Sequence, residues 1–285
     1  MVNRWNMIFN IFVMLFWLYF WSGRNKKIFF NPYLSSIMGF TSKAVNYLRP
    51  LTGSLPITYT ALITMFLLLV LRAFLNPLFE PRLTIGLLSW NIQTVSLPTS
   101  IACSFIIFLK FLIPFYALST LYVHDKEEYC PSEESVFLFF AKPFSYLNRN
   151  LRPLVLLLFV VVLLILMNFI SPLHVISTGN MPIEVGGNIV LVFVSALYQL
   201  IGVLNVIYQF CIFLIIFSWI ALFTGSAQLA SFSRSWLYFL MGPIKNMHLA
   251  IGPFDLTPLI FIFGIRILYI LLAGILEKSF ISMLG

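Results

Sequence analysis

Long apolar segments alternate with short polar segments along the whole chain. Residues 185–233 contain no charged side chain, and residues 189–223 form an almost unbroken apolar run. About 20 apolar residues are enough to cross a bilayer as a helix, so this run indicates an integral membrane protein. Six segments have this character: 5–21, 57–75, 101–123, 153–170, 189–223 and 256–276. The pattern therefore predicts an all-α polytopic membrane protein with about six transmembrane helices.

The fifth apolar segment, residues 189–223, is too long for one upright transmembrane helix. It is consistent with one long tilted helix, or with two helices separated by a break near Gly202 and Asn205. No proline or charged residue marks a turn in this stretch, which favours the single helix. A break would place the last loop on the other side of the membrane.

The loops between the apolar segments differ strongly in charge. Loops 22–56, 124–152 and 224–255 together contain eleven Lys and Arg residues, whereas the opposite side of the membrane holds only three. Because cytoplasmic loops of membrane proteins are enriched in Lys and Arg, the three basic loops are predicted to lie in the cytoplasm, with both termini outside. The expected location is a bacterial cytoplasmic (inner) membrane, with an organelle membrane as the alternative.

A short motif recurs in the three basic loops. It consists of a basic residue followed four positions later by a tyrosine, a spacing that places the two side chains on one face of a helix. The copies are Phe40-x-x-Lys43-x-x-x-Tyr47, Phe139-x-x-Lys142-x-x-x-Tyr146 and the weaker Arg234-x-x-x-Tyr238. Apolar residues around these positions predict short amphipathic helices in the headgroup plane, with rings toward hydrocarbon and amines toward anionic lipid. The chain is then three hairpins, each with an interfacial helix in its loop.

Composition limits the chemistry that this chain is expected to perform. It is 61% hydrophobic and 9% charged, against about 25% charged residues in soluble proteins. The three cysteines show no CxxC or Cys/His spacing, and the sequence contains no P-loop or HExxH motif. The net charge of +8 is accounted for by the basic loops, so it does not indicate nucleic acid binding. We therefore expect neither catalytic activity nor a cofactor or metal.

The last hairpin contains the most specific motifs of the chain. They are Ser218-Trp219, Gly242-Pro243-Ile244-Lys245 and Gly252-Pro253-Phe254-Asp255-Leu256-Thr257-Pro258. Their order resembles the YggT family of small bacterial and chloroplast membrane proteins, which carry a Ser-Trp pair at one helix end, a Pro-Ile-Arg loop and a Gly-x-Asp-x-Ser-Pro helix start. The first hairpin resembles the same unit more faintly, through Asn31-Pro32, Leu48-Arg49-Pro50-Leu51 and Pro56-Ile57-Thr58.

The resemblance covers about residues 8–75 and 200–276. It divides the chain into a first YggT-like hairpin (1–78), a middle hairpin or insertion (79–184) and a second YggT-like hairpin (185–285). The paired arginines of the family are reduced here to Arg49 in the first unit and Lys245 in the last, and Thr257 replaces the usual serine. The middle part holds an acidic loop, which we interpret as solvated, with a cation or partner contact as the alternative. Its acidic residues are Asp125, Glu127, Glu128, Glu133 and Glu134.

Two residues predict how the last transmembrane helix begins. Asp255 is expected at the N-cap, where its carboxylate would accept from the free amides of the first turn and suit the helix dipole. Pro258 fits the first turn, because its missing N–H costs nothing there. Pro153 is expected to begin the fourth apolar helix in the same way.

Three basic residues fall inside apolar segments: Arg72, Lys110 and Arg266. Arg72 lies one turn from the end of its segment, where its side chain is expected to snorkel to the interface. Lys110 and Arg266 lie near mid-span, where a charge costs about 2.5–3.5 kcal/mol. No acidic residue lies at matching depth, so polar side chains or helix carbonyls are the expected partners. The polar candidates are Asn168, Gln199, Asn205 and Gln209.

Two classes of function fit these patterns. The YggT resemblance implies an assembly or organising factor, with roles such as cofactor attachment to membrane cytochromes, placement of nucleoids or division machinery, and osmotic tolerance. Its partners would be anionic lipid headgroups and another membrane or cytoplasmic protein, and a homo-oligomer stays open. The expected contact residues are Lys43, Arg49, Lys142, Arg234, Lys245 and Asp255. The alternative is a transporter or channel component in which Lys110 and Arg266 line an intramembrane path.

Overall fold

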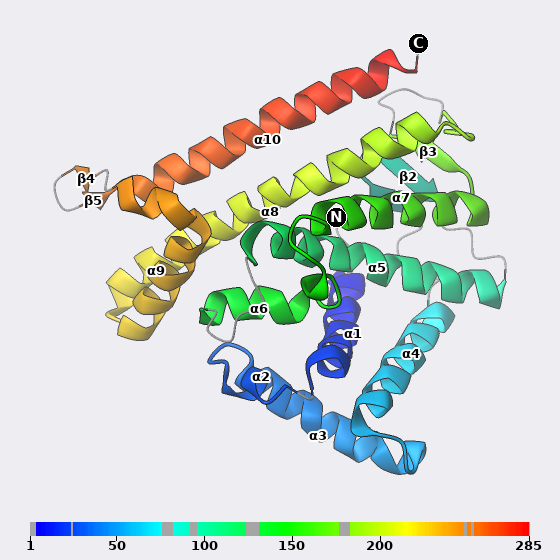
Figure 1. The fold of residues 1–285 in the computed structure, drawn as a ribbon, viewed down its shortest axis with the longest axis horizontal. Helices are drawn as coiled ribbons and strands as arrows, with labels where there is room; N and C mark the ends of the chain where they lie inside the picture. The colour runs from blue at the N-terminus through cyan, green and yellow to red at the C-terminus, as the bar shows by residue number, and fades with distance from the viewer. Residues whose placement is uncertain are drawn as a thin grey trace. The chain divides into compact units, whose positions relative to one another are not determined.

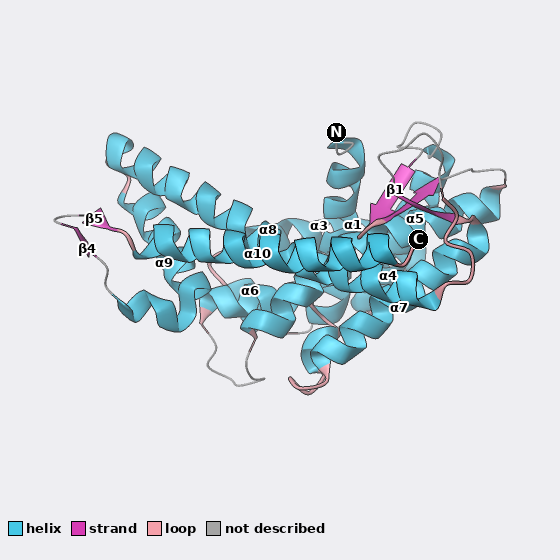
Figure 2. Ribbon diagram, turned by 90° about the horizontal axis from the view of Figure 1, so that it is seen from above, coloured by secondary structure: helices cyan, strands magenta, loops and turns pink. Residues whose placement is uncertain are grey.

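The chain forms two compact units, Met1–Ala196 and Leu197–Gly285, and each is considered by itself. A computed structural model describes most of the 285 residues (Figure 1). The described residues are 4–23, 25–75, 82–91, 96–123, 131–176, 183–247, 250–251 and 254–284. Helices dominate both units, and strands are confined to short segments (Figure 2).

Helices follow one another along the chain with short connections. The first unit contains α1 (Arg4–Ser22), α2 (Lys27–Phe30), α3 (Ser35–Thr52), α4 (Ile57–Leu75), α5 (Leu97–Tyr122), α6 (Ser132–Phe140), the 3-10 helix η2 (Phe144–Tyr146) and α7 (Arg152–Ile170). Helix α8 (Ile189–Thr224) begins in the first unit and continues into the second. The second unit adds α9 (Ala227–Met241), the 3-10 helix η3 (Gly242–Met247) and α10 (Thr257–Ser282).

Within the described residues, five helices are long and apolar enough to cross a membrane: α4, α5, α7, α8 and α10. The predicted all-α membrane class is therefore confirmed. The first predicted segment forms α1, whose apolar part, Asn6–Ser22, is shorter than these five, so the count of six spans stays a prediction. The fifth segment forms one continuous helix of 36 residues, which passes through Gly202 and Asn205 without a break.

Helix α5 is the centre of the first unit, where it packs against α4, α6 and α7. Its apolar side chains are buried on several sides, including Phe108, Leu112 and Ile113. Ser96 fixes the start of the helix, because its Oγ accepts from the Thr99 amide (3.4 Å) while its own amide donates to Thr99 Oγ1 (3.2 Å). This reciprocal capping satisfies two amides that a helix start leaves without partners. Pro153 lies in the first turn of α7, as predicted.

A short antiparallel sheet joins two loops of the first unit. Its strands are β1 (Arg82–Ile85), β2 (Leu88–Asn91) and β3 (Leu173–Val175), in the order β1-β2-β3. Leu83 pairs with Trp90, and Ser89 pairs with His174. The pattern of apolar residues predicted no strand here, because segments this short carry no distinct alternation. Both loops were predicted on the side opposite the basic loops, and their pairing agrees with a shared side.

The β1–β2 turn is fixed by the start of α8. Ser195 Oγ donates to the Ile85 carbonyl (2.9 Å) and accepts from the Leu87 amide (3.1 Å). Gly86 between them has a φ of +60°, and a Cβ at this position would lie 2.1 Å from the Ser195 carbonyl oxygen. Only glycine fits such a left-handed, close approach.

The two basic loops of the first unit contact each other, as expected for loops on one side of the membrane. Asn31 Nδ2 donates to the Ser132 carbonyl (3.0 Å) and to Ser135 Oγ (2.7 Å). Tyr33 donates to Glu133 Oε1 (2.8 Å), so one residue of the acidic loop connects α6 to the start of α3. Three other acidic positions of that loop lie outside the described residues: Asp125, Glu127 and Glu128.

In the second unit, α9 packs against α8 through a buried tryptophan. Helix α9 is capped by Ser226, whose Oγ accepts from the Leu229 amide (3.4 Å), and it ends at Gly242 with a φ of +53°. The Trp236 ring meets Phe210 of α8 edge-on, with 5.8 Å between ring centroids. The amphipathic helix predicted in this loop is therefore present.

The last transmembrane helix begins one residue later than predicted. Asp255 belongs to β5 (Phe254–Asp255), which pairs with β4 (Ala250–Ile251), and Leu256 occupies the N-cap of α10. The N-cap assignment of Asp255 is therefore wrong, because the hairpin holds its backbone in the strand. Pro258 does lie in the first turn, where its missing N–H costs nothing.

Candidate functional site

Helix α3 carries the first copy of the basic-aromatic motif on an exposed face. Met38 and Val45 are fully buried on one side of the helix, which packs against α1 and α4. On the other side, Phe40 is 61% exposed, Tyr47 is 85% exposed and Lys43 between them is exposed as well. The spacing of three and four residues aligns these three side chains. We call Phe40, Lys43 and Tyr47 the α3 basic-aromatic face.

The neighbouring basic position, Arg49, is exposed in the last turn of α3. Gly53, with a φ of +61°, ends the helix four residues later. Arg49 therefore adds a second exposed cation near the α3 basic-aromatic face, without belonging to the same row of side chains.

The second copy of the motif departs from the prediction. Helix α6 ends at Phe140, and a turn containing Pro143 separates Lys142 from η2, so Lys142 and Tyr146 do not share a helix face. Lys142 is only 5% exposed, and its Nζ lies 5.2 Å from the Phe139 ring centroid and 5.0 Å from that of Tyr146. The prediction that Lys142 is offered to headgroups or a partner is wrong, because two aromatic rings enclose its ammonium group.

The third copy, on α9, agrees with the first. Arg234 and Tyr238 are exposed on one side of the helix, while Ser233, Trp236 and Leu240 are buried on the other. Lys245 is exposed in η3, just after the helix. We call Arg234 and Tyr238 the α9 basic-aromatic face. The remaining predicted contact residue, Asp255, has its backbone in β5.

Arg72 does not snorkel, contrary to the prediction. It is completely buried between α1, α4 and α5. Its Nε donates to Ser104 Oγ (2.9 Å), its Nη1 donates to Asn10 Oδ1 (2.6 Å) and its Nη2 donates to the Ser104 carbonyl. The guanidinium also lies 5.8 Å from the centroid of the Phe9 ring. Partners on two neighbouring helices satisfy this charge inside the protein, which gives Arg72 a structural role.

Arg152, counted from the sequence as a loop charge, is a second buried structural arginine. Its Nε, Nη1 and Nη2 donate to the carbonyls of Leu147 (3.0 Å), Val123 (2.6 Å) and Ser145 (3.1 Å). These carbonyls lie after α5 and around η2, so Arg152 holds that loop to the start of α7. The position next to Pro153, at a helix start, was the one available signal for this role.

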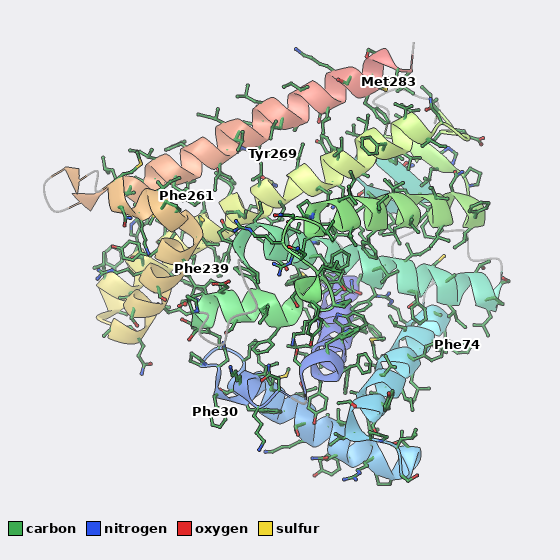
Figure 3. All side chains as sticks on the ribbon, in the orientation of Figure 1. Phe30, Phe74, Phe239, Phe261, Tyr269 and Met283 are labelled. Carbon is green, nitrogen blue, oxygen red and sulfur yellow. The ribbon has the colours of Figure 1, made fainter. Side chains whose placement is uncertain are left out.

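Arg266 is the basic residue within the apolar stretch of α10, in the second unit. It is half-buried on α10, and its Nη1 donates to Asn205 Oδ1 of α8 (2.9 Å). Its guanidinium lies 5.1 Å from the Tyr208 ring centroid and 5.5 Å from that of Tyr269, which Figure 3 labels. Asn205 was one of the predicted partners of an intramembrane cation, so this pairing is confirmed. We call Asn205, Tyr208, Arg266 and Tyr269 the arginine seam.

A second polar contact joins the same two helices. The Tyr198 hydroxyl of α8 donates to Glu277 Oε1 near the end of α10 (2.7 Å). The other predicted partner positions behave differently: Asn168 donates to the Gly186 carbonyl (3.3 Å) and accepts from the Leu173 amide (3.1 Å). Lys110 is half-buried on α5 of the first unit.

The chemistry of the described residues is that of contacts and charge, not of a metal centre. In the described parts of the chain, no three His, Cys, Asp or Glu side chains come together in a way that could hold a metal ion. Cys103 and Cys211 are buried free thiols on α5 and α8. The candidate surfaces among the described residues are the two basic-aromatic faces and the arginine seam.

Comparisons with protein-family models, curated proteins and solved structures give no match for this chain. The resemblance to the YggT family therefore rests on the sequence motifs alone and stays a prediction. The described residues of those motifs lie between α2 and α3, at the end of α3, at the start of α4, near the end of α8, in η3 and at the start of α10.

Proposed function

We propose that this chain is a multi-pass membrane protein of the YggT type that assembles or organises another protein at the membrane and catalyses no reaction. In this proposal α1 is the first of six spans, the membrane is a bacterial cytoplasmic membrane, and the basic loops lie on its cytoplasmic side. The partner docks on the α3 and α9 basic-aromatic faces, with Arg49 and Lys245 beside them.

The observation that carries the proposal is the two-sidedness of α3. Its buried side is held by α1 and α4, so the helix does not need its outer side to stay folded. That outer side nevertheless presents two large rings and a lysine, at exposures of 61% for Phe40 and 85% for Tyr47. Aromatic residues are enriched at protein interfaces, and aromatic and basic residues together are typical of helices at the headgroup level of membranes.

Charge indicates the kind of partner. The residues on or beside the two faces are Lys43, Arg49, Arg234 and Lys245, all exposed and all cationic. Complementary potentials across an interface favour an acidic partner surface and speed its approach. Anionic lipid headgroups offer the same charge, and the rings would then lie at the headgroup boundary.

Site-specific photocrosslinking separates these sources of negative charge. A photoreactive amino acid at position 47 is expected to give one defined protein adduct, and the same group at buried position 45 is expected to give none. Lys43→Gln combined with Arg49→Gln should reduce the adduct severalfold, because the charge complementarity is lost. Adducts to lipid alone, or a protein adduct that the double variant leaves unchanged, would contradict docking on α3.

Transport is the second candidate, and Arg266 is the observation that favours it. Its guanidinium lies mid-span and is incompletely enclosed within the described residues. A path for anions would make chloride flux into vesicles depend on Arg266 and Lys110. Purified wild-type protein that gives no flux above protein-free vesicles would remove this candidate, and a flux abolished by Arg266→Leu would put it ahead of the organising role.

A further inference from the structure

We propose that the arginine seam binds a transmembrane helix of a partner protein that carries an aspartate or glutamate at mid-membrane depth. The inference rests on the proposed organising function in one respect, namely that this chain works by holding another membrane protein. It uses a different surface from the basic-aromatic faces and names the chemistry of the partner.

The first argument is that Arg266 uses few of its hydrogen-bond donors within the described residues. A guanidinium has five N–H donors. Within the described residues, one of them donates, to Asn205 Oδ1, and two tyrosine rings supply the other contacts. Arg72, by contrast, uses its Nε and both terminal nitrogens. The remaining donors of Arg266 match a carboxylate, which can accept two parallel N–H bonds from one guanidinium.

The second argument is depth. Arg266 is the tenth residue of the 26-residue helix α10, and at 1.5 Å per residue it lies roughly 5 Å from the helix midpoint. The hydrocarbon core is about 30 Å thick, so a lipid phosphate would have to be drawn on the order of 10 Å inward to reach it. A carboxylate on a membrane helix can reach that depth without such a displacement.

The third argument is that this chain cannot supply the carboxylate itself. All nine of its acidic residues lie outside the six apolar segments. Glu277, which lies on α10, is eleven residues beyond Arg266, about 16 Å along the helix, and it accepts from Tyr198. A second copy of the chain would bring the same residues at the same depths, so the occupant is a different protein.

The fourth argument is the surface around Arg266. Leu259, Phe263, Arg266 and Ile270 follow one another at spacings of four, three and four residues, the pattern that lets one helix pack along another. The three apolar members of this row are exposed, Phe263 by 64%. We call these four residues the α10 row. A partner helix along the α10 row would bury apolar side chains and bring its acidic residue to Arg266 at once.

The test uses the full chain, reconstituted in phosphatidylcholine vesicles, and a synthetic probe. The probe is a polyleucine transmembrane peptide with lysine ends and a single central glutamate, compared with otherwise identical peptides carrying glutamine or leucine. Energy transfer between a donor at the C-terminus of the chain and an acceptor on the peptide reports association. The glutamate peptide is expected to associate about tenfold more tightly than the leucine peptide, with glutamine between them.

Protein variants then locate the site. Arg266→Leu should abolish the preference for glutamate, Arg266→Lys should keep part of it, and Lys110→Leu, a matched cation on α5, should keep all of it. The peptide comparison on the unchanged chain needs no variant to fold, so it stands by itself. Equal association of the three peptides, or a preference that survives Arg266→Leu, would overturn the proposal.

Two further arms of the peptide experiment are needed. One distinguishes lipid phosphate from a protein carboxylate as the group bound at the arginine seam, and the other distinguishes this proposal from docking on α3. If lipid phosphate fills the seam, adding phosphatidylglycerol to the vesicles removes the preference for glutamate, which overturns the protein partner. Lys43→Gln with Arg49→Gln should leave the preference unchanged, because those residues lie on α3. A failed crosslink at position 47 with a retained glutamate preference would therefore contradict the α3 docking surface alone.

Discussion

Each unit has an arginine within a long apolar helix, and the two arginines differ in burial and in the number of their hydrogen bonds. Arg72 of the first unit is fully buried, with Asn10 and Ser104 of neighbouring helices accepting from its three nitrogens. Arg266 of the second unit is half-buried and has one amide oxygen and two tyrosine rings. The same charge on similarly apolar helices is thus a buried structural centre in one unit and a partly exposed group in the other.

The apolar helices of the two units also differ in how much of their surface is buried. Inside the protein, 56% of the apolar stretch of α5 is buried, but only 11% of that of α10. A Cβ on Gly86 of the first unit would collide with the Ser195 backbone, whereas a Cβ on Gly202 of the second would meet nothing within 4 Å. The apolar stretch of α10 is therefore much less enclosed than that of α5, which leaves exposed apolar surface beside Arg266.

The largest expected effect separates the two arginines. Arg72→Leu should lower the free energy of unfolding by about 3 kcal/mol, because it leaves the buried Asn10 amide oxygen without its donor and removes two hydrogen bonds to Ser104. Arg266→Leu should change it by less than about 1 kcal/mol, because the seam is open. Unfolding by dodecyl sulfate in mixed micelles measures both. An equal loss in the free energy of unfolding for the two variants would show that Arg266 is as important for stability as Arg72.

The next effect compares two glycines. Gly86→Ala should destabilise by about 2 kcal/mol or more, since it combines a left-handed backbone with a collision at Ser195. Gly202→Ala, within α8, should instead be neutral or stabilising by up to about 1 kcal/mol, because alanine is the better helix former and the space is open. The same unfolding titration tests the pair, and a stable Gly86→Ala variant would show that the β1–β2 turn can move away from α8.

A smaller effect distinguishes the two copies of the lysine motif. Lys142→Met keeps the stem but removes the ammonium between Phe139 and Tyr146, and should cost roughly 1–2 kcal/mol. Lys43→Met is expected to leave stability unchanged, because Lys43 is exposed, and to weaken crosslinking at position 47. If Lys43→Met destabilises the protein as much as Lys142→Met does, the α3 basic-aromatic face has a structural role.

The smallest effect probes the arginine seam itself. Asn205→Ala removes the side-chain oxygen that accepts from Arg266 and should cost about 0.6 kcal/mol, the average of such contacts between membrane helices. Tyr208→Phe keeps the ring beside the guanidinium and should have no effect. A loss of several kcal/mol in Asn205→Ala would mean that the seam is closed and structural, as the Arg72 site is.

Much of the helical architecture follows from the sequence, because the length and apolarity of a segment decide whether it can cross a bilayer. The apolar runs predicted α4, α5, α7, α8 and α10 with boundaries within six residues of those observed, and the lack of a proline or charge favoured the unbroken α8. Pro153 and Pro258 located two helix starts, since proline tolerates the first turn. The motif copies on α3 and α9 face outward, as their helical spacing predicts.

Other features depend on contacts between distant residues, which spacing along the chain cannot reveal. The burial of Arg72 requires Asn10 and Ser104, 62 and 32 residues away, and the position of Arg72 near a helix end pointed instead to snorkelling. Lys142 was placed on a helix face by a spacing that Pro143 interrupts. The small sheet joins segments more than 80 residues apart.

The sequence by itself determined the membrane class, the main helices and the sites of the polar residues, because hydropathy and helical periodicity are local properties. Only the tertiary structure decided which of the charged residues are satisfied internally. Arg72, Arg152 and Lys142 are enclosed, whereas Lys43, Arg234 and Arg266 are left accessible. That division depends on which helices meet around each charge, and it determines where this protein can bind something else.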